Sequence, residues 1–480
     1  MSLTSALAAF AAETPSASLP PEVPDRALAL VSDFVGSIVR ASREAESTPA
    51  MLAMVDHLGL AGGGPCVVFG LGRRYGAAAA ALLNGALGHS LDFDDTHADS
   101  SLHPSAPVFP AALAAAERVE ASGEDFLAAV AIGFEICCRL GNALDPMAHY
   151  ERGFHPTATA GTFGAAAAAG RLLRLDRKGM EAAFGIAASQ ASGSLQFLEN
   201  GAWNKRYQVG EAAMKGLMAA SLAAGGFVGA KDAIDGKHGF LNAYSDGARP
   251  ERASAGLGEV WETMRIGVKP YPTCRYTHAA IDGLLALREA HGWRADRIER
   301  ITVGLHRNGI ALVGTPLAAK RRARSVVEGQ FSMPFAAAVA LLRGRFGWDD
   351  YDLLGDPAVD DLADRIDVRH EPDLEGLPHP FGAALDAVVD GASHTLRVRD
   401  PSGEPETFPD AAARAAKFDA LTRPVLGAGT ERLSARLAAV RDATSLRGHF
   451  DAPRPAMNAS AGSSRTRRSN SGPRPAAGRQ

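Results

Sequence analysis

One dense cluster of polar residues, from His89 to Ser105, stands between two alanine-rich segments. Histidine and aspartate recur in it, and such side chains can bind a metal ion or form an acid–base site in which a carboxylate orients a histidine. A capped helix end with a solvated acidic face is the structural alternative, because Asp, Thr and Ser are good N-caps. Loops of this length inside a helical domain are often functional, so the cluster is a candidate site.

A second candidate is His155, in the segment Gly153-Phe-His-Pro-Thr157. The proline and threonine that follow it are typical of a helix start, which places His155 just ahead of a helix N-terminus. Free backbone N–H groups and the helix dipole favour an anion at such a position. A carboxylate could therefore bind there, although His155 could also simply help to cap the helix.

Two further segments carry cations that could hold an anion. Lys205 and Arg206 follow a Gly-Ala-Trp-Asn turn, while Lys269, Arg275 and His278 recur along a segment whose backbone two prolines restrict. Residues of this kind are ordinarily surface charges. A solvated turn is likewise favoured over substrate contact for the basic run that includes Lys320, Arg321, Arg322 and Arg324.

The cysteines give no support to a cofactor. The chain has four of them, and they include no C-x-x-C pair and no tetrahedral Cys/His spacing, so disulfides, an iron–sulfur cluster and structural zinc are not expected. A phosphate loop and a dinucleotide fingerprint are also missing. We therefore expect chemistry by side chains alone, with no cofactor and no metal. A metal hydrolase built on His89, Asp92, Asp95 and His97 is the weaker alternative.

The elements that must position these residues are mainly helical. Apolar residues recur at helical spacing from Pro21 to Glu46, and the pattern stays helical from Gly76 to about Gly258. Alternation typical of strands appears only later, at Ile301 to Leu305, at Ile366 and Val368, and at Leu396 and Val398. A helix at Phe335 to Leu342 lies between the first two, and helix returns from Pro409 to about Leu446.

These periods predict a mainly α protein, in which a large all-α domain carries an inserted, smaller α+β lid. The helical domain spans 22–265 plus 409–447, because the last helices are too small to be stable alone, and the lid spans 268–400. Residues 451–480 contain almost no large apolar side chains and are expected to be disordered. This tail holds six Arg and one Asp, so it contributes +5 and leaves −9 of the net charge of −4 for the rest.

The mildly acidic body argues against nucleic acid as a partner. No uncharged apolar run reaches about 18 residues, since the best candidate is interrupted by Glu135 and Arg139, and we expect no membrane span. The first 24 residues contain no Lys or Arg, so the charged start of a secretory signal is missing. A cytoplasmic location is expected.

Several separate segments, in a specific order and spacing, resemble the MmgE/PrpD family over about residues 22–447. They are 84–114 with its Leu91-Asp-Phe-Asp-Asp-Thr96 and His103-Pro-Ser105 motifs, 153–157, Asn204-Lys205-Arg206, Gly225-Gly226-Phe227, Lys237-His-Gly-Phe240 and Lys269-Pro-Tyr-Pro272. The family includes 2-methylcitrate dehydratase, cis-aconitate decarboxylase and iminodisuccinate epimerase. The resemblance implies a helical domain with an α+β lid, a homodimer, no metal or iron–sulfur cofactor, and a small polycarboxylate as substrate.

The resemblance also implies the site residues. Catalytic roles fall to His103, Asp92, Lys205 and Lys269, and substrate binding falls to Thr96, His155 and His278. The need to bind two or three negative charges adds Arg275 to the substrate-binding residues and leaves His103, held by Asp92, as the leading proton carrier. Gln208 stands where many relatives have a histidine. The expected reaction is that of a lyase, either a hydro-lyase or a carboxy-lyase. A carboxylate epimerase and a non-catalytic carboxylate-binding relative remain alternatives.

Overall fold

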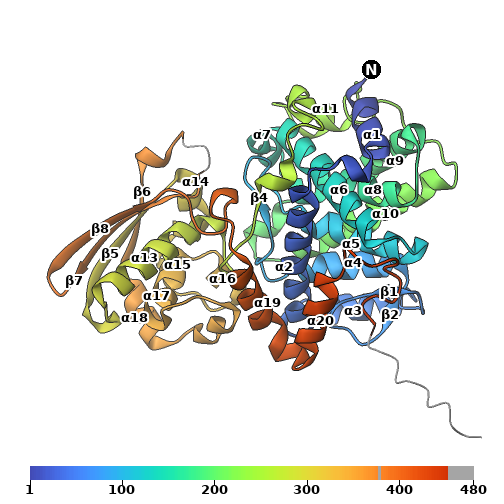
Figure 1. Cartoon of the computed structure of the whole chain (residues 1–480). Coiled ribbons are helices and arrows are strands. Elements are labelled where there is room, and N and C mark those ends of the chain that lie inside the picture. The colour runs from blue at the N-terminus through green and yellow to red at the C-terminus, as the bar shows by residue number, and fades with distance from the viewer. Residues whose placement is uncertain (377–379, 452–480) are drawn as a thin grey trace, which may run out of the picture. The chain divides into compact units, whose positions relative to one another are not determined.

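The computed structural model describes residues 1–376 and 380–451. Buried apolar side chains form two clusters, and we name the elements around them the helical part and the sheet part (Figure 1). The mainly helical class expected from the sequence is confirmed. The predicted disordered tail lies outside the described residues, apart from Asp451. Whether the sheet part is a separate lid domain stays a prediction.

The helical part contains the helices α1–α12, α19 and α20 and two short strand pairs. Its helices are α1 (Leu3–Glu13), α2 (Glu22–Glu44), α3 (Thr48–His57), α4 (Ala77–Gly88), α5 (Ser105–Val119), α6 (Gly123–Leu144), α7 (Pro146–Glu151), α8 (Pro156–Leu172), α9 (Arg177–Gln190), α10 (Asn204–Ala224), α11 (Phe240–Tyr244), α12 (Glu251–Ser254), α19 (Ala411–Leu426) and α20 (Gly429–Ala438). The strand pairs are β1 (Cys66–Val67) with β2 (Arg74–Tyr75), and β3 (Thr96–His97) with β4 (Ile266–Gly267).

The sheet part has four strands, and the order β6-β5-β7-β8 places β5 (Ile298–Leu305) and β7 (Ala383–Val389) in the centre. The outer strands are β6 (Ile366–His370), parallel to β5, and β8 (Ala392–Val398), antiparallel to β7. The remaining helices are α13 (His278–His291), α14 (Arg307–Gly309), α15 (Leu317–Lys320), α16 (Val326–Gln330), α17 (Met333–Arg343) and α18 (Pro357–Asp364). The three strands predicted from the sequence are found as β5, β6 and β8, and the helix predicted at Phe335 to Leu342 is found as α17. Strand β7 was not predicted, because nearly all of its residues are apolar and do not alternate with polar ones.

The N-terminal boundary predicted at residue 22 is wrong, because α1 precedes it and belongs to the same core. Leu7, Ala8 and Ala11 of α1 are fully buried. The carboxylate of Asp235 accepts the backbone N–H groups of Leu3 and Thr4, at 2.9 and 3.1 Å, and so satisfies two donors of the first turn. Sequence patterns did not predict α1, because its mostly small residues show no clear helical spacing of apolar and polar positions.

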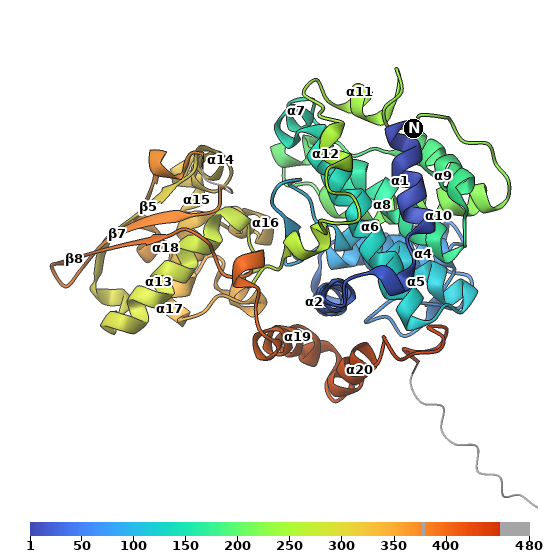
Figure 2. The ribbon, with the colours of Figure 1, turned by 45° about the horizontal axis from the view of Figure 1, so that its top comes forward.

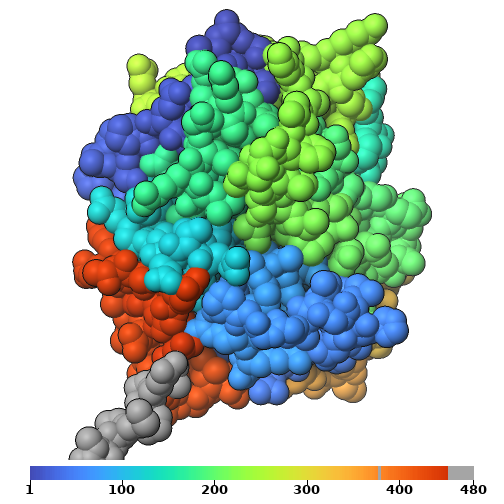
Figure 3. Space-filling view, turned by 90° about the vertical axis from the view of Figure 1, so that its right-hand side faces the viewer, coloured from blue at the N-terminus to red at the C-terminus, as the bar shows by residue number. Residues whose placement is uncertain are grey.

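The C-terminal helices pack on α2, although they form two helices rather than the single one predicted (Figure 2). Gly427 separates α19 from α20 and has a positive φ of 52°. The ammonium of Lys417 on α19 lies 2.8 Å from a carboxylate oxygen of Asp33 on α2 and donates to the carbonyl of Phe93 at 2.8 Å. The last segment also lies against the residues near position 121, where Leu446 donates its N–H to the carbonyl of Ala121 (Figure 3).

Helix α6 is long and apolar enough to cross a membrane by length and composition, and its most apolar 18-residue window is completely buried within the structure. Glu135 and Arg139 interrupt its apolar run, as the sequence shows, but two charges do not by themselves exclude a span by that test. The structure makes α6 a core helix. Both charged side chains are fully buried and have partners, which are described with the site.

We expect a chain that ends at Phe450 to keep wild-type solubility, melting temperature and activity. A chain that ends before Pro409 should be insoluble, because it loses five buried side chains of the helical core, namely Phe418, Leu421, Leu437, Val440 and Leu446. At about 1.5–3 kcal/mol each, their burial is comparable with the roughly 5–15 kcal/mol that stabilises a typical protein. Soluble yield and thermal unfolding measure both outcomes, and a stable, active fragment that ends near residue 400 would refute the partition.

Candidate active site

A cavity of about 640 Å³ lies between the helical part and the sheet part. This volume is within the range of about 300–1,000 Å³ that is usual for small-molecule sites. The helical part contributes the end of α4 and residues 197–206, and the sheet part contributes residues between 311 and 331. The polar lining residues include His89, Asp92, Lys205, Arg206, Thr315, Lys320 and Gln330.

Asp92 lies on the wall of this cavity between two lysines. Its carboxylate oxygens are 2.5 Å from the ammonium of Lys205 and 3.0 Å from that of Lys269. Lys269 also donates to the main-chain carbonyl of Asp92 at 3.0 Å. Burial alone would raise the pKa of Asp92, but the two ammonium groups outweigh it and hold that pKa well below its ordinary value. The trio therefore carries a net positive charge in a buried position.

The backbone of Asp92 is unusual, because its φ is +51°. Residues with a side chain rarely occupy this left-handed region, and Asp tolerates it better than most. The strained position turns the main-chain carbonyl and the side chain of Asp92 toward the same ammonium group, that of Lys269. Local conformation and ion pairing thus support each other.

His103 has a different partner from the predicted one. Its Nδ1 donates to the main-chain carbonyl of Asp95 at 2.8 Å and lies 3.6 Å from a carboxylate oxygen of Asp94. The prediction that Asp92 holds His103 is therefore wrong, since the carboxylate of Asp92 is engaged with the lysines. The Nδ1 bond leaves Nε2 as the unprotonated nitrogen. Burial lowers the pKa of His103 well below its ordinary value, so the imidazole is neutral.

His155 is the N-cap residue of α8, as predicted, but its side chain does not cap the helix. Its Nδ1 instead accepts a hydrogen bond from the amide of Gln208 at 2.8 Å. Burial lowers the pKa of His155 well below its ordinary value. Gln208, the position at which this chain departs from the family pattern, therefore assigns the proton of His155 to Nε2.

The sequence reasoning considered His89 only as a metal ligand and gave no role to Asp94, and the structure brings both to the site. His89 lines the cavity, and its Nδ1 is 2.7 Å from a carboxylate oxygen of Asp94. The Nε2 of His89 is buried and has no hydrogen-bond partner among the described residues. The ring of His89 lies 4.7 Å from that of His103 and 6.1 Å from that of His155, measured between centroids. Their place in the polar cluster that follows an alanine-rich helix was the available signal.

Arg275 and His278 are tied to their own surroundings and do not line the cavity. The guanidinium of Arg275 pairs with Glu404 and donates to Nδ1 of His278 at 2.9 Å. Nε2 of His278 donates to the carbonyl of Thr273 at 3.1 Å, so both ring nitrogens are engaged. Thr96 is half-buried in β3, opposite Gly267 of β4. Substrate contact by these three residues stays a prediction that the cavity lining does not support.

The residues of the metal alternative do not converge as a group. The carboxylate of Asp95 accepts the N–H and the hydroxyl of Ser105 and so caps α5, which is the structural role considered for this cluster. Nε2 of His97 is bound to Glu262 instead. His89, Asp94 and His103 do offer ligand atoms within 4.8 Å of one another. The expectation that the enzyme needs no metal stays a prediction.

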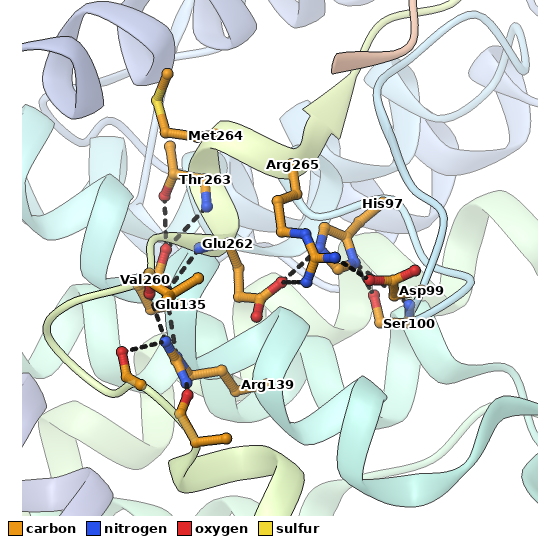
Figure 4. A network of polar contacts seen from close by, with 12 residues as sticks. His97, Asp99, Ser100, Glu135, Arg139, Val260, Glu262, Thr263, Met264 and Arg265 are labelled. Carbon is orange, nitrogen blue, oxygen red and sulfur yellow. Dashed lines mark hydrogen bonds and ion pairs between the residues drawn. The ribbon is translucent and has the colours of Figure 1, made fainter. Parts of the chain in front are cut away.

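A buried network fixes the polar loop of the site against α6 (Figure 4). Glu135 on α6 accepts the N–H groups of Glu262 and Thr263, at 3.0 and 2.9 Å, and Glu262 in turn accepts from Nε2 of His97 at 2.9 Å. Arg139 donates to the carbonyls of Ala255 and Val260, at 2.7 and 2.6 Å. The segment between α12 and β4, which precedes Lys269, is thereby bound to α6. Through Glu262 and His97 it also holds the loop that contains Asp92.

Asp92, Lys205 and His89 line the cavity. Lys269 contacts Asp92, and the imidazoles of His103 and His155 lie beside that of His89, but these three residues are not part of the lining. Ammonium groups bind carboxylates, and a neutral imidazole with one unprotonated nitrogen can accept a proton. The site is therefore suited to an anionic substrate from which a proton is removed or to which one is delivered. Cys274, also near the site, has its pKa raised by burial and is a weak nucleophile.

We expect His278 to make stability depend on pH. Burial, followed by the charge of Arg275, lowers its pKa in the folded state, whereas the unfolded chain protonates it near pH 6.5. The unfolded state then binds more protons below that pH, so the free energy of unfolding decreases as the pH falls. In urea titrations, wild type should lose up to about 1.4 kcal/mol per pH unit more than His278→Gln below pH 6.5. Parallel curves would contradict a buried neutral His278.

Comparison with known proteins places the chain among enzymes of one family. The MmgE/PrpD N-terminal domain matches residues 5–253, and the MmgE/PrpD C-terminal domain matches residues 271–442. The cis-aconitate decarboxylase-like protein oryM of Aspergillus oryzae is 32% identical over 404 residues, which are 80% of this chain and 83% of that protein. The cis-aconitate decarboxylase of Aspergillus terreus is 32% identical over 371 residues (72% and 75%), and the human cis-aconitate decarboxylase is 28% identical over 333 (66% and 67%). Both domain matches and these relatives show that the chain belongs to the MmgE/PrpD family.

Proposed function

We propose that the protein is a cofactor-independent lyase that acts on a small di- or tricarboxylate. The observation that carries this proposal is the pair of ammonium groups around Asp92, because Asp92 and Lys205 line the cavity together with the neutral His89. Two cations and one carboxylate leave a positive charge that a substrate carboxylate can balance. Because Asp92 and Lys269 are buried, this attraction is stronger than on the surface.

The two reactions of the proposal place the same demands on the site. In decarboxylation the carbon–carbon bond to a carboxylate breaks, CO2 leaves, and the electron pair that stays on the carbon skeleton takes up a proton. In dehydration a C–H proton is removed, and the hydroxyl group leaves as water after protonation. Both need a proton carrier beside fixed cations. His103 remains the leading carrier, and His89 with Asp94 is a second imidazole in position for the other proton.

The names of the relatives favour decarboxylation of cis-aconitate as the first reaction to assay. Dehydration of a 2-methylcitrate-like acid is the other member of the same class. The homodimer and the cytoplasmic location expected from the sequence also remain proposals. Exposed apolar side chains on α10 and the loop after it, including Met218, Leu222 and Phe227, would suit contact with a second copy.

We expect the dialysed protein to turn over at least one acid from a panel of cis-aconitate, citrate and 2-methylcitrate. Alkene absorbance and CO2 release distinguish dehydration from decarboxylation, and prior treatment with a chelator should leave the rate unchanged. An epimerase would instead incorporate solvent deuterium next to a carboxylate without net loss of substrate. Folded protein that binds these acids with neither turnover nor exchange would refute the lyase and favour a binding protein.

We expect His103→Ala to abolish turnover while the fold stays intact, because positioned acid–base groups typically contribute a factor of about 10²–10⁴ to the rate. Lys205→Ala and Lys269→Ala should mainly raise KM, by roughly the 1.5–3 kcal/mol of a charge-assisted contact. Steady-state kinetics and melting temperatures measure these effects. The clamp assignment would be wrong if both lysine variants bound substrate with wild-type affinity.

A further inference from the structure

The structure separates the four cations of the basic run 320–324 into two kinds. Arg321, Arg322 and Arg324 form ion pairs with acidic residues of the sheet part, at 2.6–2.7 Å. Those partners are Asp367, Asp364 and Asp360, respectively. Lys320 donates to the main-chain carbonyl of Leu312 at 2.8 Å, and none of the described carboxylates lies within ion-pair distance of it.

Lys320 lies on the cavity wall that the sheet part supplies. It is the last residue of α15, and the hydroxyl of Ser332 donates to its carbonyl at 2.5 Å, so the backbone is fixed at this point. The other cations of the lining, Lys205 and Arg206, come from the beginning of α10 in the helical part. The cavity therefore has cations on both walls.

The charges of the lining are distributed by depth. Lys205, Arg206 and Lys320 are half-buried, whereas the lining glutamates Glu46 and Glu199 are exposed, as is Glu328. The ammonium of Lys320 bonds to the carbonyl of Leu312, and burial lowers its pKa although Glu328 opposes this effect. An anion that reaches the half-buried zone between the two walls would compensate the charge of Lys320.

We propose that Lys320 determines specificity by binding a second carboxylate of the substrate, remote from the carboxylate held at Lys205 and Lys269. This inference rests on the proposed function. A substrate bound at both walls needs two carboxylates that are separated along its skeleton. An acid that lacks the remote carboxylate contacts one wall only and loses one charge-assisted contact.

The test compares two acids that differ by one carboxylate, cis-aconitate and citraconate, the latter with a methyl group in place of the carboxymethyl group. In Lys320→Gln, Kd and KM for cis-aconitate should rise roughly 10- to 100-fold, while Kd for citraconate changes less than twofold and kcat less than threefold. Arg322→Gln removes the same charge from the same run and should leave all constants within twofold. Lys320→Arg should restore most of the affinity, which separates loss of charge from damage to the loop.

Calorimetry of the full-length protein keeps this inference distinct from the lyase itself. Binding of cis-aconitate that weakens in Lys320→Gln supports the subsite even if the wild type turns over none of the acids, an outcome that would refute only the lyase. Turnover by the wild type with an unchanged KM in Lys320→Gln overturns the subsite alone. The subsite is also overturned if Lys320→Gln weakens the binding of both acids equally, or if Arg322→Gln weakens cis-aconitate binding as much as Lys320→Gln does. In either case a general change of the electrostatic potential in the cavity would explain the effect.

Discussion

The site depends on one buried carboxylate, that of Asp92, which lies between the ammonium groups of Lys205 and Lys269. Like charges this close repel each other in a buried position, and removal of one partner from a buried ion pair typically costs about 3–5 kcal/mol. Asp92 therefore allows two cations to lie close together, one of them on the cavity wall, and leaves one positive charge uncompensated. That remaining charge makes the cavity suitable for an anionic substrate.

The rest of the fold holds these three residues in place from distant parts of the chain. Asp92 lies in the loop after α4, Lys205 begins α10, and Lys269 follows the segment that Glu135 and Arg139 bind to α6. Lys417 of the C-terminal helix α19 bonds to the carbonyl of Phe93, directly after Asp92. Elements from before and after the sheet part in sequence therefore meet at the loop that contains Asp92.

Helical spacing of apolar residues predicted α2, a continuous apolar run predicted α17, and apolar alternation predicted three of the four strands of the larger sheet. Sequence patterns missed α1, whose small residues show little contrast, and β7, in which every residue except Asp386 is apolar so that no alternation appears. Motif spacing predicted which residues surround the site, but not their pairing. Which groups contact His103, and which cation of the basic run lacks a carboxylate partner, depends on how the chain folds back on itself. His103 bonds to the carbonyl of Asp95, 8 residues before it, and Arg322 pairs with Asp364, 42 residues after it.

The ionisation of Lys205 tests the central role of Asp92 most directly. In the wild type the attraction of Asp92 outweighs burial and raises the pKa of Lys205 above its ordinary value. NMR titration of the Lys205 ammonium, compared between wild type and Asp92→Asn, measures this contribution. The account predicts that the pKa of Lys205 falls below its ordinary value in the variant, because burial and the charge of Lys269 then act without compensation. An unchanged pKa would contradict it.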